Sequence, residues 1–430
     1  MQLSYPIILQ FKLIQVVLHL LQTFKTFQLT ALEQGMPNIA MDTSPPPTPP
    51  SRAPEDDERR FKTITSPCEW VEDYHPCGYH PYRVIRKLGE GSYSTVWLAR
   101  DQRNNRYVAL KILVAEISAS TTELRILHHI AQVAPVEGAR YIKELLDKFE
   151  HRGPNGTHKC LAFEPMGPSV NAMVEELPQF KPCKWEMKVR YPPQMAKAIL
   201  KQSLEALAFL HGNDIAHGDF QPGNMLFARN METRLISPPC AKVDGKEDKW
   251  APRYLCVAQP LAPFTYCGEG FKIKFSDMGG GHVFFTDPPA KPVTPCGLRA
   301  PELVLTGALY KTLDIWSFGC LIFELVTGQP LFCISGSDDF EDDDYLLDLT
   351  AQLGALPDEL FQHWKTSSTV LSGGVAEGEE PLMLEMASME DMFDQAGPDL
   401  DEEEARKLKA LIRRMLPYDP AKRLTCGNSA

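Results

Sequence analysis

The sequence predicts an α+β fold, because segments with strand character come first and a helical segment follows them. Residues 84–99 predict two strands joined by a glycine-containing tight turn, and residues 107–113 alternate like a third strand. Residues 118–130 have helical spacing, with Leu124, Leu127 and Ile130 on one face. At 430 residues, the chain is long for a single compact domain.

The turn between the first two strands is suited to phosphate binding. Gly89 and Gly91 carry no Cβ, so their backbone N–H groups can approach phosphate oxygens closely. Ser94 stands where a third glycine is usual in such loops. On its own, this segment fits an ordinary glycine-rich hairpin equally well.

The third strand and the following helix each offer one charged side chain. Lys111 lies in a Val-Ala-Leu-Lys setting directly after the hairpin, and we interpret it as the cation for nucleotide α- and β-phosphates. Glu123 is the acid expected to pair with Lys111 and to hold it toward the nucleotide. The alternatives are a solvated edge lysine and an ordinary surface glutamate.

Residues 217–224 contain the most informative pattern, an Asp and an Asn five residues apart. Asp219 has the chemistry to orient or deprotonate a hydroxyl, and Asn224 the chemistry to hold Mg²⁺. Asp277 follows a short apolar strand and precedes a glycine, which suits a second metal-binding carboxylate. Further along the chain come Ala-Pro-Glu with Glu302, an Asp-Ile-Trp-Ser-Phe-Gly segment at 314–319, and a late Arg423.

These motifs, in this order, resemble the eukaryotic-type protein kinases from about residue 82 to the C-terminus. The resemblance implies a bilobal protein-kinase-like fold, with a small antiparallel β-sheet lobe at 82–163 and a larger, mainly helical lobe at 164–430. It implies ATP and Mg²⁺ as cofactors. It assigns catalysis to Asp219, Lys111, Glu123 and Gln221, the metal to Asn224 and Asp277, and a structural ion pair to Glu302 and Arg423.

The same resemblance assigns the nucleotide pocket. Residues 161–167 are similar to the kinase hinge, with Phe163 as gatekeeper and backbone groups of Glu164 and Met166 facing adenine. The expected ATP-binding residues are Leu88, Gly89, Glu90, Gly91, Ser92, Val96, Ala109, Lys111, Glu164 and Met166.

A narrower resemblance is to the SR-protein kinases, in a short form like those of fungi. Residues 72–89 and 94–99 are similar to that family's entry segment, and residues 231–270 form an insertion where that family carries a spacer. A neutral surface insertion is the alternative for 231–270. The resemblance implies transfer to Ser of basic, Arg/Ser-rich proteins, a role in regulating mRNA splicing, and a cytoplasmic or nuclear location.

Three positions depart from the family pattern. Gly218 replaces the Arg that reads a phosphorylated activation loop, so activation should not depend on phosphorylation of Thr286 or Thr294. Gln221 replaces a Lys that contacts the γ-phosphate and removes a positive charge there. Met278 replaces Phe after Asp277, a change between similar apolar volumes.

Charge and cysteine content narrow the choice of partners. The net charge of −12 disfavours direct nucleic-acid binding and suits a basic partner, with acidic runs at 338–344 and 399–404 as candidate docking sites. Solvated acidic loops are the equal alternative. The 11 cysteines lack paired Cys-x-x-Cys spacing, so neither a zinc site nor a disulfide framework is indicated. We expect a monomer without membrane association.

The two ends of the chain differ from the family. Residues 1–40 begin with an apolar segment of doubtful status, for which a start at Met36 or Met41 is the preferred interpretation. Residues 41–81 combine a Pro-rich linker with the family-like entry segment. Only seven residues follow Arg423, so we expect a truncated C-terminus.

Two other functions remain open from the sequence. A small-molecule phosphotransferase of the aminoglycoside/choline kinase type has a similar His-Gly-Asp-x-x-x-x-Asn loop, but the segments at 300–302 and 314–319 favour protein kinases. A pseudokinase scaffold fits Gln221 and the short C-terminus, whereas Lys111, Asp219 and Asn224 favour an active enzyme.

Overall fold

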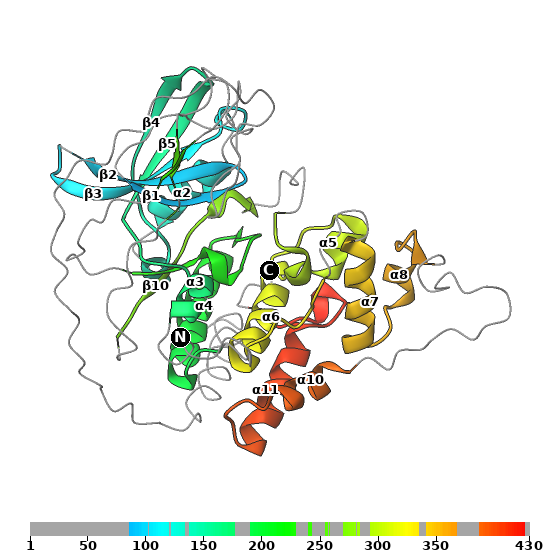
Figure 1. The fold of residues 1–430 in the computed structure, drawn as a ribbon. Coiled ribbons are helices and arrows are strands. Elements are labelled where there is room, and N and C mark those ends of the chain that lie inside the picture. Colours follow the sequence, from blue (N-terminus) through cyan, green and yellow to red (C-terminus); the bar gives the residue numbers. More distant parts are fainter. Residues whose placement is uncertain are drawn as a thin grey trace, which may run out of the picture.

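The structure is a computed structural model, and it describes the following residues: 86–101, 103–119, 122–133, 137–176, 190–228, 240–242, 254–256, 258, 270–280, 282–283, 293–334, 341–367 and 387–425. The expectations for residues 1–81 and most of those for 231–270 lie outside these ranges. Figure 1 shows a β-sheet with helix α2 at one end of the molecule and a group of helices at the other. The α+β fold class with two lobes is therefore confirmed.

The N-terminal part is one antiparallel sheet with strand order β1-β2-β3-β5-β4. Its strands are β1 (Arg86–Gly91), β2 (Ser94–Asp101), β3 (Arg106–Leu113), β4 (Leu145–Gly153) and β5 (Gly156–Phe163). Strand β1 continues through both glycines, so the turn that joins it to β2 lies at residues 92–93, later than the glycines themselves.

Alternation along β3 sorts its side chains onto two faces. Leu110 and Ile112 pack in a small apolar cluster with Trp97 of β2, whereas Ala109 and Lys111 line a cavity on the other face. Lys111 is opposite Val96 on one side and Leu161 on the other. Because successive side chains of β3 point to opposite faces of the sheet, Lys111 lies on the same face as the apolar Ala109.

Helix α2 (Thr122–Val133) lies against this sheet and carries Glu123 in its first turn. The helix begins four residues later than its predicted start and ends three residues later than its predicted end. Ile126, Leu127 and Ile130 are buried, so the predicted apolar face is the packed face.

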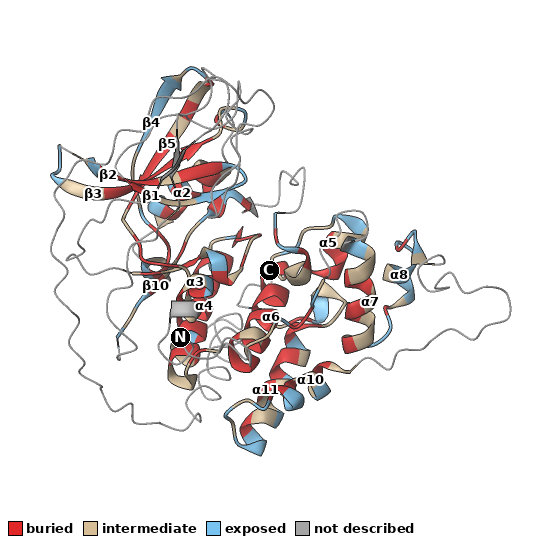
Figure 2. Ribbon diagram, in the orientation of Figure 1, coloured by how far each residue is buried: buried red, intermediate tan, exposed pale blue. Residues whose placement is uncertain are grey.

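The C-terminal part is mainly helical, with its apolar side chains buried between helices (Figure 2). The α-helices there are α3 (Val170–Glu176), α4 (Pro193–Gly212), α5 (Pro301–Thr306), α6 (Leu313–Thr327), α7 (Glu341–Leu353), α8 (Asp358–Phe361), α10 (Met389–Ala396) and α11 (Glu402–Met415). Short 3₁₀ turns are η2 (Glu137–Tyr141), η4 (Pro222–Asn224), η5 (Met278–Gly280), η6 (Cys296–Leu298) and η7 (Pro420–Lys422).

Helix α6 is the centre of the helical part. Almost every residue from Leu313 to Thr327 is buried, as expected of a helix that is apolar on all sides. Helices α4 and α11 pack against it. It ends at Gly328, whose φ of 80° is the left-handed conformation that favours glycine at a helix C-terminus.

Among the residues that the structure describes, three short antiparallel strand pairs lie outside the five-stranded sheet. β6 (Ile215–Ala216) pairs with β11 (His282–Val283), β7 (Met225–Phe227) with β10 (Ile273–Phe275), and β8 (Cys240–Lys242) with β9 (Tyr254–Cys256). The β8–β9 pair lies inside the predicted insertion. The β7–β10 pair brings residues 225–227 beside 273–275, which places Asn224 and Asp277 at the same end of one hairpin.

No helix in the described ranges is both long and apolar enough to cross a membrane.

Candidate active site

The candidate site is a cavity of about 320 Å³. It lies between the five-stranded sheet and two loops, the one that precedes β7 and the one that follows β10. Twelve of the residues expected from the sequence line it: Leu88, Gly89, Glu90, Gly91, Val96, Ala109, Lys111, Glu123, Phe163, Met166, Asn224 and Asp277. The expected catalytic residues Asp219 and Gln221 are not among its lining residues. Ser92 is not among the lining residues and lies in the exposed turn after β1. Lys111 and Glu123 of the N-terminal part therefore line the same cavity as Asn224 and Asp277 of the C-terminal part.

Lys111 joins two carboxylates within the cavity. Its Nζ lies 2.9 Å from Glu123 Oε2 and 2.9 Å from Asp277 Oδ1. Burial lowers the pKa of Lys111, but the two carboxylates outweigh this and raise it overall. The lysine is therefore charged, and it ties helix α2 to the loop after β10.

The two carboxylates respond differently to the same lysine. Burial, together with the nearby Asp277 carboxylate, leaves the pKa of Glu123 raised even though Lys111 lowers it. For Asp277, burial also raises the pKa, but the Lys111 ammonium outweighs it and leaves the pKa lowered. The Asp277 carboxylate is 46% exposed, so it presents a charged group to the cavity.

Asp277 also has an unusual backbone conformation. Its φ of 59° is in the left-handed region, which non-glycine residues seldom adopt. The N–H of Gly279 donates to Asp277 Oδ1 at 3.2 Å, a local contact that supports this turn. Strain of this kind persists where surrounding contacts determine the conformation, and it concentrates at functional sites.

The loop at 217–224 is fixed from below by helix α6. The buried carboxylate of Asp314 accepts the N–H of His217 at 2.8 Å and that of Gly218 at 2.9 Å, and His211 Nε2 lies 2.9 Å from it. Burial raises the pKa of Asp314, but these partners outweigh it and lower the pKa. From the sequence, Asp314 is assigned only to the 314–319 motif, and the sequence signal for its role is its position at the start of an apolar helix.

Gly218 is suited to its position by its backbone. Its φ is 71°, a conformation that glycine adopts without a steric penalty. Its carbonyl accepts the hydroxyl of Thr294 at 2.5 Å. Thr294 is only 1% exposed, so this candidate phosphorylation site is buried, and Thr286 lies outside the described residues.

Asp219 is held by two neutral amides. Gln221 Nε2 donates to Asp219 Oδ1 at 2.7 Å, and Asn224 Nδ2 donates to Oδ2 at 2.7 Å and to the Asp219 carbonyl at 2.9 Å. Burial raises the pKa of Asp219, and nearby His217 and the amides offset this only in part. Gln221 therefore positions Asp219 without adding a charge beside it.

The hinge-like segment follows β5. Phe163 and Met166 are buried and line the cavity, whereas Glu164 does not line it. The Glu164 side chain instead pairs with Lys274 and accepts the N–H of Glu144 at 3.2 Å. Met278 is buried, lines the cavity and takes the place expected for an apolar side chain after Asp277.

Asn224 and Asp277 fit a shared cation site. Asn224 donates through its side-chain nitrogen to Asp219, so Oδ1 of Asn224 forms no hydrogen bond with any described residue. Lys111 donates to Oδ1 of Asp277, so Oδ2 of Asp277 also forms no hydrogen bond with any described residue. Mg²⁺ commonly uses one or two protein oxygens together with substrate phosphates. Within the described ranges, no group of three or more His, Cys, Asp or Glu residues forms a protein-only metal site.

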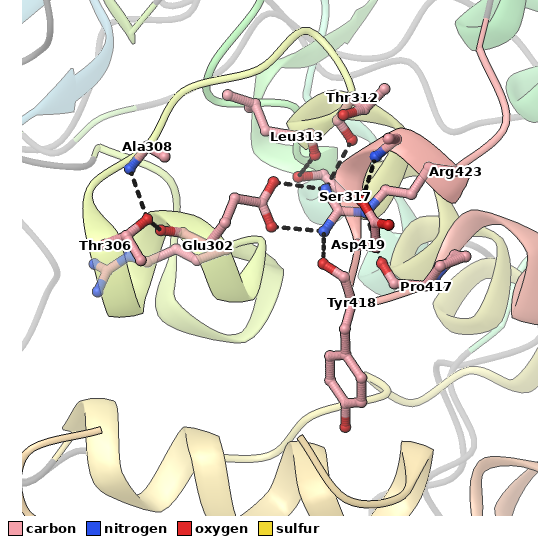
Figure 3. A network of polar contacts seen from close by, with 12 residues as sticks. Glu302, Thr306, Ala308, Thr312, Leu313, Ser317, Pro417, Tyr418, Asp419 and Arg423 are labelled. Carbon is pink, nitrogen blue, oxygen red and sulfur yellow. Dashed lines mark hydrogen bonds and ion pairs between the residues drawn. The ribbon is translucent and has the colours of Figure 1, made fainter. Parts of the chain in front are cut away.

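A buried ion pair lies apart from the cavity and holds the last segment of the chain. Arg423 donates to Glu302 Oε1 at 2.7 Å and to Oε2 at 2.6 Å, as Figure 3 shows. The guanidinium carbon is 5.0 Å from the centre of the Trp316 ring. The structure thus brings together the two residues expected to pair across 121 positions.

Comparisons with known proteins agree with this geometry. The family model described as "Protein kinase domain" matches residues 82–252 and 264–429, with its break inside the predicted insertion. The serine/threonine-protein kinase SRPK of Physarum polycephalum is 30% identical over 84% of this chain and 89% of its own length. The protein kinase dsk1 of Schizosaccharomyces pombe is 26% identical over 84% of this chain and 83% of its own.

A solved structure shows the same fold. The crystal structure of the PF14_0431 kinase domain matches with a TM-score of 0.52 at 24% identity, and covers 80% of this chain and 92% of that one. A two-lobed fold with a lysine paired to a helix glutamate, and a loop that carries an Asp and an Asn, is typical of the protein kinases. The chain belongs to the protein kinase domain family, and within it to the serine/threonine-protein kinases of the SRPK type.

Proposed function

We propose that this kinase transfers the γ-phosphate of ATP, in the presence of Mg²⁺, to serine hydroxyls of basic, Arg/Ser-rich proteins in the cytoplasm or nucleus. One observation supports the chemistry above all others. Lys111, Asp277 and Asn224 come from three separate segments and line one cavity, with Lys111 charged and paired to Asp277. Asp219 belongs to the same loop as Asn224 and is hydrogen-bonded to it. Positioning and electrostatic stabilisation are what phosphoryl transfer requires of a protein.

Each side chain then has one task. Lys111, set by Glu123, binds the α- and β-phosphates, and the backbone at Gly89 and Gly91 covers them. Asn224 and Asp277 are the residues that would hold Mg²⁺, which supplies charge neutralisation at the phosphate oxygens. Asp219 accepts a hydrogen bond from the serine hydroxyl and directs it toward the γ-phosphate.

The neutral Gln221 alters the electrostatics of this step. Family members with lysine at this position have a cation near the γ-phosphate, whereas Gln221 here donates to Asp219. A neutral donor stabilises transition-state charge less than a cation does. We therefore expect transfer with a modest turnover.

The preference for a basic substrate is supported by charge. The chain has a net charge of −12. A second cavity of about 330 Å³ shares Gly223 with the first and is lined by Gln221 and by Glu324 of α6. The acidic side chain of Glu324 therefore lies in the same cavity as Gln221 of the 217–224 loop. An acidic side chain at this place suits a basic residue of a peptide substrate.

The test is γ-phosphate transfer from Mg²⁺-ATP to an Arg-Ser repeat peptide. An acidic serine peptide and the Asp219→Asn enzyme serve as controls. Transfer to the Arg-Ser peptide alone, lost in the variant, supports the proposal. Transfer to neither peptide while ATP still binds would leave a pseudokinase scaffold or a small-molecule phosphotransferase.

A further inference from the structure

A second lysine, Lys143, also faces the cavity and has no task in the proposed reaction. It lies between η2 and β4, and its N–H donates to the carbonyl of Phe275 at 2.9 Å. The preceding residue, Ile142, forms an isolated bridge with Phe275. These contacts fix the Lys143 backbone beside the strand that leads to Asp277.

The Lys143 side chain is buried but unpaired. It is 9% exposed and lines the cavity, and its Nζ lies 4.4 Å from the centre of the Phe163 ring. No described residue forms a hydrogen bond or ion pair with this ammonium. An ammonium removed from water without a partner is costly, so this group favours an acceptor that a ligand would bring.

The charged groups near Lys143 do not repel an added anion. Lys143 interacts electrostatically with Lys111, Glu123, Asp277 and Glu164. Lys111 and Lys143 together balance Glu123 and Asp277, so an added carboxylate meets no net repulsion from these four groups. Burial, with Lys111, lowers the pKa of Lys143 to about 8, so the amine is still mainly protonated at neutral pH.

The cavity is suited to a flat apolar ligand that reaches this ammonium. Its lining includes Leu127 and Phe275 as well as Phe163, and it therefore extends along the ring to Lys143. We propose that Lys143 is the binding site for the carboxylate of a planar aromatic ligand that occupies the nucleotide cavity. The aromatic body packs on the apolar wall, and the carboxylate accepts from the Lys143 ammonium on the Phe163 side.

The experiment compares two matched probes on the full chain. One is a 2-aminopyrimidine that carries a benzoate, and the other has a methyl group in place of the carboxylate. Binding is measured directly by calorimetry, so the result does not depend on phosphate transfer. We expect the benzoate to bind about tenfold to a hundredfold more tightly, the range for a charge-assisted hydrogen bond at a buried site.

Variants assign that preference to one side chain. Lys143→Met keeps a side chain of similar length without the charge and should bind both probes equally. Lys143→Arg keeps the charge and should retain most of the preference for the benzoate. Lys148→Met, which removes an exposed lysine of β4, should leave the preference unchanged. Thermal unfolding verifies that each variant is folded, and Lys143→Gln replaces Lys143→Met if the latter does not fold.

Two results would overturn the inference. Equal binding of the two probes to the unmodified chain would show that the Lys143 ammonium donates no hydrogen bond to a ligand carboxylate. A preference for the benzoate that survives in Lys143→Met would assign the carboxylate to another group, such as Lys111. Neither result would alter the proposed transfer reaction, since it does not use Lys143.

Discussion

At the scale of single residues, the environment of Asp219 sets this kinase apart. Its carboxylate accepts one hydrogen bond from Gln221 and one from Asn224, both neutral amides. Two of the three departures from the family pattern, Gly218 and Gln221, have structural consequences of different kinds. Gly218 fits a left-handed backbone, whereas Gln221 changes the charge beside the reacting groups.

Asp219→Asn should abolish transfer and leave ATP binding nearly intact. The amide that replaces the carboxylate cannot accept the serine proton, and Asp219 does not belong to the groups that face the α- and β-phosphates. Turnover should fall by roughly a hundredfold or more, the usual contribution of a general base. Single-turnover transfer and nucleotide affinity, measured on the same preparation, check this, and an active variant would remove Asp219 from the mechanism.

Gln221→Lys should raise turnover if the missing charge limits the chemical step. A lysine there adds a cation next to Asp219 and toward the γ-phosphate, where charge develops. We expect an increase of several-fold, about the effect of one added electrostatic contact in a partly exposed site. The comparison of kcat at saturating peptide checks this, with Gln221→Met as the uncharged control of similar length. No gain would mean that the loop is adapted to the amide.

At the scale of elements, helix α6 organises the site from beneath. Asp314 at its first turn fixes the loop before Asp219, and Trp316 packs under Arg423, which pairs with Glu302 of α5. The same helix thus positions both the candidate base and the last described segment. Figure 3 shows that Arg423 also reaches the carbonyls of Pro417, Tyr418 and Thr312.

Arg423→Met should destabilise the helical part by about 3–5 kcal/mol, because it leaves the Glu302 carboxylate buried without its partner. Arg423→Met combined with Glu302→Gln should cost less than Arg423→Met alone, since the uncompensated charge is then absent. Thermal and urea unfolding of the single and double variants check this. A double variant as unstable as the sum of the single variants would contradict a buried ion pair.

Glu324→Gln should stabilise the protein at pH 8 and have little effect at pH 5. Burial raises the pKa of Glu324 from 4.5 to about 7 in the folded chain. A carboxyl with a raised folded-state pKa supports the fold below pH 4.5, and this support is lost as the pH rises through about 7. We expect about 1–3 kcal/mol at pH 8. Unfolding midpoints at both pH values check the sign, and an equal effect at both would contradict it.

At the scale of the whole molecule, the acidic runs have structural tasks. In the run at 399–404, Asp401 caps the N-terminus of α11, Glu404 returns the bond to the Asp401 N–H, and Glu403 pairs with Arg406. In the other run, Asp343 accepts from Trp364 at 2.7 Å, and residues 338–340 lie outside the described ranges. These contacts give Asp343, Asp401, Glu403 and Glu404 structural roles, and docking of a basic partner at either run stays a prediction.

We attribute the proposed preference for a basic peptide to the molecule's overall charge and to the cavity at Glu324. KM for the Arg-Ser peptide should rise several-fold between about 50 and 300 mM salt, because screening weakens attraction between exposed opposite charges. The KM for ATP should change much less. A KM for the peptide that is independent of salt would contradict electrostatic attraction of the substrate.

The order of motifs along the chain determined the fold class and the residues around the cavity. Lys111, Asp219, Asn224 and Asp277 were identified because phosphate and metal chemistry restricts which side chains can serve, and this restriction is visible in residue type and spacing alone. Local chemistry of this kind does not depend on knowing the neighbours.

Only the tertiary structure decided which polar groups have partners. The residue type and local sequence of Lys143 and Asp314 do not name their partners, and the positions of both depend on contacts with residues about 100 or more positions away. The burial of Thr294 and the capping role of Asp401 are of the same kind. Burial and pairing arise from packing between distant segments, and that information is not present in any local stretch of the sequence.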